Sequence, residues 1–284
     1  MQSLRTRNAS LILAGICFGT TGTAQALGPK GVSPLAVGSA RLIIGAFFLL
    51  FFHRAISTST AKISRQDLIL GAVGVALYQI TFFSAVKSTG VAIGTVTALG
   101  SAPALTGIVS YLITREKPTQ RWFVATIITT LGIVVLSTAK NSASFNLRGF
   151  LLALGAGASY SLFAVVSKRA LASGVKITEA MFRIFALAAV LSSPLLFIGS
   201  TSWIFTARGS SMILWLGLVP TAIAYMAYAY GLEKVRASTA STLILAEPAT
   251  ATVLAAVLLG ETINGRGWIG IVVVIVGLLY LSYK

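Results

Sequence analysis

The chain has 284 residues, of which 56% are apolar and only 10% are charged, and its mean hydropathy is +0.90. Soluble domains carry about 25% charged residues, so this composition excludes an ordinary soluble enzyme and a disordered protein. Cys17 is the single cysteine, which excludes an internal disulfide framework. The net charge of +16 is unusual, because in a soluble chain it would indicate nucleic-acid binding.

A membrane-spanning helix needs about 20 predominantly apolar residues, and ten such stretches follow one another along the chain. We predict spans at residues 8–27, 34–53, 66–86, 91–113, 120–138, 148–168, 178–199, 210–231, 237–259 and 266–283. Only short loops join them, so the sequence predicts an all-α polytopic membrane protein with ten transmembrane helices. The first span resembles a cleaved signal peptide, but we expect it to be retained because it is part of an internal repeat.

Most of the basic residues lie in the loops and tails between the predicted spans. Fourteen Lys and Arg fall in the two tails and in the loops on the same side of the membrane, and six fall on the other side. Loops rich in Lys and Arg remain in the cytoplasm. The bias therefore predicts a multi-pass protein of the cytoplasmic (inner) membrane with cytoplasmic N- and C-termini. Each loop holds one to three of these charges and no basic stripe forms, which argues against nucleic acid as a partner.

The two halves of the chain match each other. A shift of 142 residues places Arg41 on Arg183, and a shift of 145 places Pro103 on Pro248. We predict two five-helix repeats, at residues 1–140 and 141–284. Because five is odd, the second repeat must be inverted in the membrane relative to the first, as in many secondary transporters.

A combination of weak motifs carries a family resemblance. These motifs are Phe18-Gly19, Pro34, Arg41, Pro103 and Glu116, echoed by Tyr160, Arg183, Glu247-Pro248 and Glu261. The pattern resembles the EamA-type transporters of the drug/metabolite transporter superfamily, and within it the YddG-type amino-acid exporters. The resemblance implies ten helices, cytoplasmic termini, a central substrate cavity and export of amino acids or other metabolites.

Glu247 is the strongest candidate for a functional residue, because it is the one acid near the middle of a predicted span. A charge there costs about 2.5–3.5 kcal/mol on insertion scales, so an intramembrane acid indicates function by default. It could bind a substrate ammonium group or carry a proton. The alternative is a protonated carboxyl group that bonds between helices.

Two prolines lie at equivalent positions of the repeats. Pro103, beside Gly100, and Pro248 would free the carbonyl groups of Leu99 and Ile244 and act as hinges, or simply kink their helices. Arg41 and Arg183 could form gates or bind a carboxylate, although the favoured explanation is extension of these side chains to the membrane surface or a bond to a neighbouring carbonyl group.

Mid-span polar side chains are further candidates for a substrate cavity. A phenol, amide or hydroxyl group suits a cavity that holds both polar and apolar parts of a ligand, although each could instead bond between helices. These candidates are Tyr78, Gln79, Thr97, Ser101, Tyr160, Tyr225, Tyr228 and Thr242.

The sequence contains no metal-ligand spacing and no catalytic constellation, so we expect neither an enzyme nor a cofactor. No Lys or Arg is predicted at the midplane, which disfavours phosphorylated substrates. The expected function is export of amino acids, aromatic or apolar ones among them, or of similar small metabolites, by alternating access. The expected partners are the small-molecule substrate, the lipid bilayer and, as a candidate, protons. Drug or other metabolite efflux and an uncoupled, channel-like facilitator are the alternatives, and an integral membrane enzyme is a distant one.

Overall fold

The computed structural model describes residues 2–56, 61–138 and 146–283, and this part of the chain is helical without a strand. Ten helical segments are long and apolar enough to span a membrane, which confirms the predicted fold class. The helices are α1 (Gln2–Leu27), α2 (Pro34–Ile56), α3 (Arg65–Thr114), α4 (Gln120–Thr138), α5 (Leu147–Ala172), α6 (Ile177–Ser192), η1 (Ser193–Phe197), η2 (Ser202–Phe205), α7 (Ala207–Gly217), η3 (Leu218–Ile223), α8 (Ala224–Lys234), α9 (Ala237–Leu243), α10 (Ala246–Leu259) and α11 (Gly265–Ser282).

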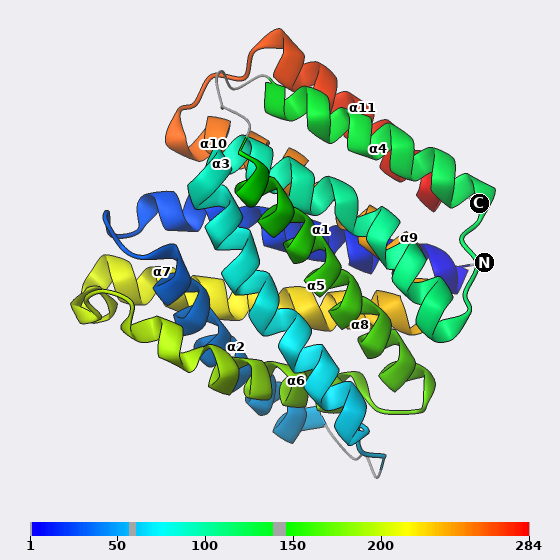
Figure 1. Cartoon of the computed structure of the whole chain (residues 1–284), viewed down its shortest axis with the longest axis horizontal. Helices are drawn as coiled ribbons and strands as arrows, with labels where there is room; N and C mark the ends of the chain where they lie inside the picture. Colours follow the sequence, from blue (N-terminus) through cyan, green and yellow to red (C-terminus); the bar gives the residue numbers. More distant parts are fainter. Residues whose placement is uncertain (1, 57–60, 139–145, 284) are drawn as a thin grey trace.

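Helix α3 contains two spans, Arg65–Thr89 and Ile93–Thr114. It runs across the molecule and then turns back, as the cyan and teal segments of Figure 1 show. Gly94 lies so close to the preceding span that an added Cβ atom would be 3.0 Å from the Cα atom of Val86. A side chain at position 94 would therefore force the two spans apart at the turn.

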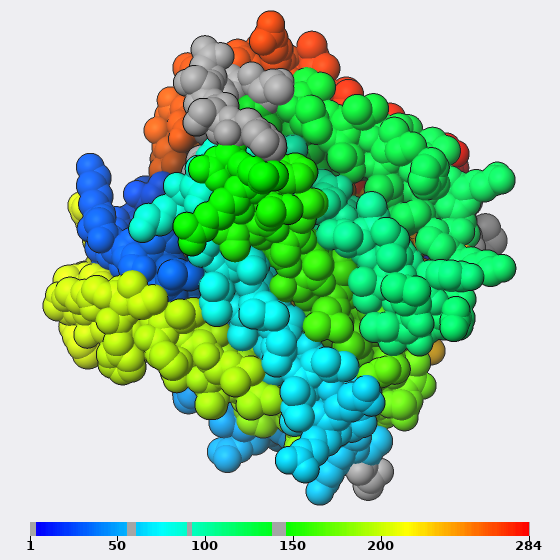
Figure 2. Space-filling view, viewed as in Figure 1, coloured from blue at the N-terminus to red at the C-terminus, as the bar shows by residue number. Residues whose placement is uncertain are grey.

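Helix α5 packs against both spans of α3. A Cβ atom at Gly74 would lie 2.9 Å from the carbonyl oxygen of Ser159, and one at Gly157 would lie 3.0 Å from that of Ala98. Small residues permit such close approach of two backbones, which replaces the hydrophobic driving force that is absent in lipid. Figure 2 shows α5, in green, against the cyan and teal spans of α3.

Two of the spans are interrupted in the membrane. The eighth, Ala207–Lys234, consists of α7, the π-helical turn η3 and α8, and Pro220 lies within that turn. The ninth, Ala237–Leu259, breaks between α9 and α10 at Ile244 and Leu245. Segments of π-helix and broken helices concentrate at functional sites, because their backbone departs from the regular hydrogen-bond pattern there.

Helices α4 and α11 form an outer pair at one side of the molecule (Figure 1). An added Cβ atom at Gly132 would lie 2.7 Å from the backbone nitrogen of Val274, and one at Gly270 would lie 2.6 Å from that of Leu136. The outward side chains of the pair are large and apolar, among them Phe123, Leu131, Trp268 and Leu279. The remaining spans enclose the interior of the protein.

Candidate functional site

A cavity of about 460 Å³ lies among α1, α2, α3, α5, α8, α9 and α10. That size is in the range of pockets that bind small molecules. Five of the side chains predicted from the sequence line it, namely Glu247, Tyr78, Tyr160, Tyr225 and Arg41. The cavity brings together residues from both halves of the chain.

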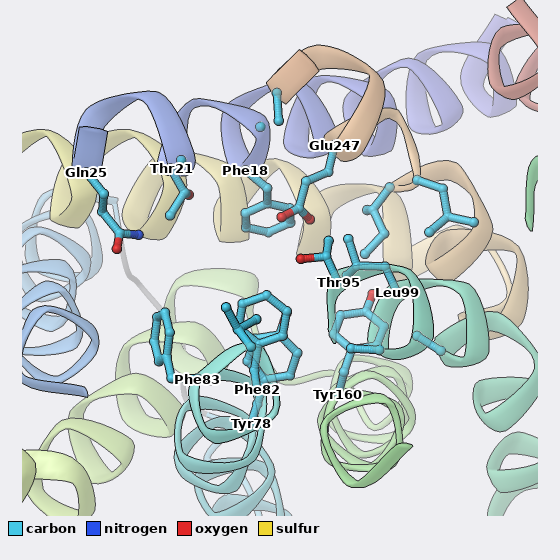
Figure 3. A pocket seen from close by; sticks show the side chains of 18 of the residues that line it. Phe18, Thr21, Gln25, Tyr78, Phe82, Phe83, Thr95, Leu99, Tyr160 and Glu247 are labelled. Carbon is cyan, nitrogen blue, oxygen red and sulfur yellow. The ribbon is translucent and has the colours of Figure 1, made fainter. Parts of the chain in front are cut away.

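Glu247 enters the cavity from the first turn of α10. Its carboxylate points toward the ring of Phe18 and toward Thr95 in Figure 3. The start of a helix carries partial positive charge on its unpaired N–H groups, which favours an acidic side chain there. The break in the ninth span thus places a carboxylate in the interior of the membrane protein and stabilises it locally.

Pro248 explains why the helix restarts at this point. A proline in the first turn removes no intrahelical bond, because the N–H groups of that turn have no helical partner. The carbonyl oxygen of Ile244 accepts a 2.9 Å hydrogen bond from the Glu247 backbone N–H. From the sequence, we expect Pro248 to leave the Ile244 carbonyl group without a backbone partner, whereas this oxygen has one.

Helix α1 lies directly on this break, through Gly15 and Gly19. An added Cβ atom at Gly15 would be 2.8 Å from the Ile244 oxygen, and one at Gly19 would be 2.8 Å from the Glu247 backbone oxygen. The four-residue spacing puts both glycines on one face of α1, so the helix can approach the start of α10.

Aromatic rings form much of the cavity wall. The rings of Phe18 and Tyr225 meet edge to face at 4.9 Å, and those of Tyr78 and Phe82 stack at 5.3 Å. Phe83 adds another ring beside Phe82 (Figure 3). Such walls suit the apolar part of a ligand, while the charged groups can orient it.

Several lining residues lie outside the predicted set of site residues, although the sequence analysis named Phe18 in the family motif and Leu99 for its carbonyl group. Besides Phe18, Phe82 and Phe83, they include Thr21, Gln25, Thr95, Ala98, Leu99 and Ala102. The last four follow the i, i+3, i+4, i+7 spacing of a single helix face. That spacing was a usable signal, but the selection by polarity alone favoured the adjacent face.

Nine predicted residues lie outside the lining of the cavity, and these are Gln79, Thr97, Gly100, Ser101, Pro103, Arg183, Tyr228, Thr242 and Pro248. Several of them have partners elsewhere. The Tyr228 hydroxyl accepts a 2.9 Å bond from Tyr160, and the Thr242 hydroxyl is 2.9 Å from that of Thr126. The alternative of bonding between helices therefore describes these two better than direct lining of the cavity.

The two arginines of the repeat have different surroundings. Arg183 forms a 2.5 Å ion pair with Glu179, one helical turn earlier. Arg41 lines the cavity, is 9% exposed, and its Nε atom has no hydrogen-bond partner in the described chain. Glu247 lines the same cavity. Arg41 is thus one of the predicted residues that reach the cavity, whereas Arg183 is not.

A second pocket, of about 840 Å³, adjoins the cavity and shares Pro34, Phe83 and Val86 with it. Lys30 and Lys87 also line this pocket, and both belong to the side with six basic residues. The second pocket thus lies between the cavity and the loops of the face that the charge bias predicts to be external.

At the helix ends on the side away from the second pocket, polar contacts join different helices. Arg7 pairs with Glu233 at 2.6 Å, and Asp67 pairs with Arg169. The Lys168 ammonium donates to the carbonyl oxygen of Leu232 at 2.9 Å, near the C-terminal end of α8. These contacts hold the helices together on the face that bears the N-terminus.

Ten apolar spans, and a cavity lined by one acid and one arginine, define a polytopic membrane protein that can hold a small solute. The EamA-like transporter family model matches residues 8–138 and again residues 147–283. The chain therefore belongs to the EamA-like transporter family and contains two copies of its repeat. Its function class is transport rather than catalysis.

Proteins similar in sequence to this chain are named as transporters or exporters. The chain is 39% identical over 274 residues to "Uncharacterized transporter YwfM" of Bacillus subtilis (strain 168), covering 96% of this chain and 92% of that protein. It is 26% identical over 242 residues to "Threonine/homoserine exporter RhtA" of Escherichia coli (strain K12), covering 84% and 76%. A solved crystal structure with a TM-score of 0.84 and 20% identity covers 99% of this chain and 96% of that one, and shows the same fold.

Proposed function

We propose that this protein exports amino acids or similar small metabolites across the cytoplasmic membrane by alternating access. The observation that carries the proposal is the Glu247 carboxylate, which faces a largely apolar cavity from the start of a broken helix. A carboxylate there can bind a substrate ammonium group. The printed name of the RhtA relative, an exporter of threonine and homoserine, supports the same substrate class.

Alternating access is supported by the arrangement of the polar contacts. A second pocket adjoins the cavity toward one face, while ion pairs such as Arg7–Glu233 join the helices at the other. In the proposed cycle this conformation is open to the outside, and its inward-open counterpart breaks those contacts. The odd number of spans per repeat supports an inverted relation of the two halves.

Proton coupling is a further part of the proposal. Glu247 would hold a proton in one conformation and a substrate ammonium group in the other. The groups that face it from the surrounding helices are Arg41, Tyr78, Tyr160 and Tyr225.

Reconstitution in liposomes tests the proposed substrate class. We expect uptake of at least one radiolabelled amino acid, and we expect unlabelled amino acid on the opposite side of the membrane to accelerate it. Acceleration by exchange identifies a carrier, because a channel-like facilitator only dissipates gradients. A complete screen of amino acids without protein-dependent flux would contradict the substrate class and favour efflux of other compounds.

Labelling of single cysteines in whole cells tests the proposed orientation and access. In a Cys17→Ala background, we expect a membrane-impermeant thiol reagent outside the cell to label Gln25→Cys, because Gln25 lines the cavity. Ser238→Cys should remain unlabelled, since Ser238 is 3% exposed and its carbonyl oxygen accepts from Trp122 near the opposite face. Absence of labelling at Gln25→Cys would contradict a cavity that opens to the outside, and labelling of Ser238→Cys alone would indicate the opposite orientation of the chain.

A further inference from the structure

Two oppositely charged side chains line the cavity. Among the described residues that line it, Arg41 is the only cationic side chain and Glu247 the only acidic one. No hydrogen bond or ion pair joins these two side chains in the described part of the chain. Opposite charges that share a cavity without pairing leave room for a ligand that carries both complementary charges.

Arg41 is held where its own helix supplies no counter-ion. Its repeat mate Arg183 is paired with Glu179 at position i−4, whereas the residue four before Arg41 is Val37. The guanidinium group has five N–H donors, and leaving them unpaired in a buried place is costly. The Nε atom of Arg41 is nevertheless buried and without a described partner. The two repeats thus share the arginine, but the one that faces the cavity has no acid four residues before it.

We infer that Arg41 binds the carboxylate of the substrate while Glu247 binds its ammonium group, so that the cavity selects zwitterionic α-amino acids over amines and amides. The inference rests on the proposed function and assigns a second charged contact to the same cavity. Arginine suits this role because its planar group can donate two parallel hydrogen bonds to one carboxylate.

The resulting selectivity differs from that of a cavity with Glu247 alone. A lone carboxylate would accept an amine, an amino-acid amide or an amino acid equally, because all three carry an ammonium group. With Arg41 as the partner, a substrate without a carboxylate leaves the guanidinium group unpaired in the cavity. Binding sites reject analogues most strongly when the mismatch strands a buried polar group.

The test compares an amino acid with its own amide as competitors for transport. In liposomes, the best-transported labelled amino acid is challenged with unlabelled amino acid and with the corresponding amino-acid amide. For the wild type we expect the amide to compete at least about tenfold more weakly. In Arg41→Gln we expect competition by the amino acid to weaken to the level of the amide, while competition by the amide is unchanged.

Two further variants serve as controls. Arg41→Lys keeps the charge without the planar group, so we expect an intermediate preference for the amino acid. Arg183→Gln removes the matching arginine outside the cavity, so we expect the wild-type preference to persist even where total flux declines.

The outcomes separate the inference from the proposed function. Amino-acid flux with equal competition by acid and amide in the wild type would overturn the role of Arg41 and leave the proposed function standing. So would retention of the preference in Arg41→Gln. Absence of all amino-acid flux in the wild type would overturn both. Should Arg41→Gln fail to fold, as judged by gel filtration in detergent, the wild-type and Arg41→Lys preferences still decide the question.

Discussion

Replacement of Glu247 by Gln is expected to reduce amino-acid flux in liposomes by about 10- to 100-fold. A hydrogen bond to a charged partner contributes about 1.5–3 kcal/mol, and each 1.4 kcal/mol corresponds to a factor of about ten. The amide is nearly the same size as the carboxylate, so the loss reflects charge and protonation rather than packing. The measurement is the initial rate of labelled amino-acid uptake with matched amounts of reconstituted protein.

Glu261→Gln is the matched control for this variant. Glu261 lies in the loop after α10 and is exposed, so its replacement is expected to leave the flux within about twofold of the wild type. A Glu247→Gln variant with wild-type flux would contradict the assigned role of the carboxylate. Residual flux that still responds to a pH gradient would contradict proton coupling through Glu247.

Gly19→Ala is expected to lower the thermal stability of the protein and to impair transport together. The new Cβ atom would lie 2.7 Å from the Cβ atom of Thr250 and 2.8 Å from the backbone oxygen of Glu247. Overpacking of this kind costs about 1–3 kcal/mol, which corresponds to a fall of about 2–12 °C in the unfolding midpoint. Thermal unfolding in detergent and flux in liposomes measure the two effects.

Gly22→Ala supplies a control with the same chemical change on the same helix. A Cβ atom at Gly22 meets no atom within 4 Å, so we expect no comparable fall in stability. Because both substitutions replace glycine by alanine in α1, the change in helix propensity is similar and the difference between them reports the contact with α10. Equal midpoints for the two variants would contradict the close packing of α1 on the break.

Several features of this protein follow from local sequence alone. Ten spans are readable because each needs a long apolar stretch, whatever its neighbours are. Glu247 is conspicuous because a charge inside such a stretch carries a large transfer cost. The repeat is visible through pairs such as Pro103 and Pro248, and the family model matches the chain twice. The likeness to YddG-type exporters stays a prediction.

Other features depend on how the helices rotate and break. Tyr78 and Gln79 are neighbours in the sequence, yet Tyr78 lines the cavity while Gln79 lies against Gly38 of α2. In lipid, most helix faces are apolar whether they face a neighbour or the membrane, so the polarity pattern does not reveal the direction of each face. The π-helical turn that contains Pro220 was not predicted, since a proline indicates a distortion of a helix but does not specify its kind.

The sequence by itself determined that this is a ten-span membrane protein of two repeats with one acid near the middle of a span. Only the tertiary structure decided that Arg41 shares a cavity with that acid while its repeat mate Arg183 does not. The physical reason is that insertion into lipid depends on the composition of each segment, whereas a binding site depends on the relative rotation of several segments. That rotation is set by close contacts such as those of Gly15 and Gly19 with the break before α10.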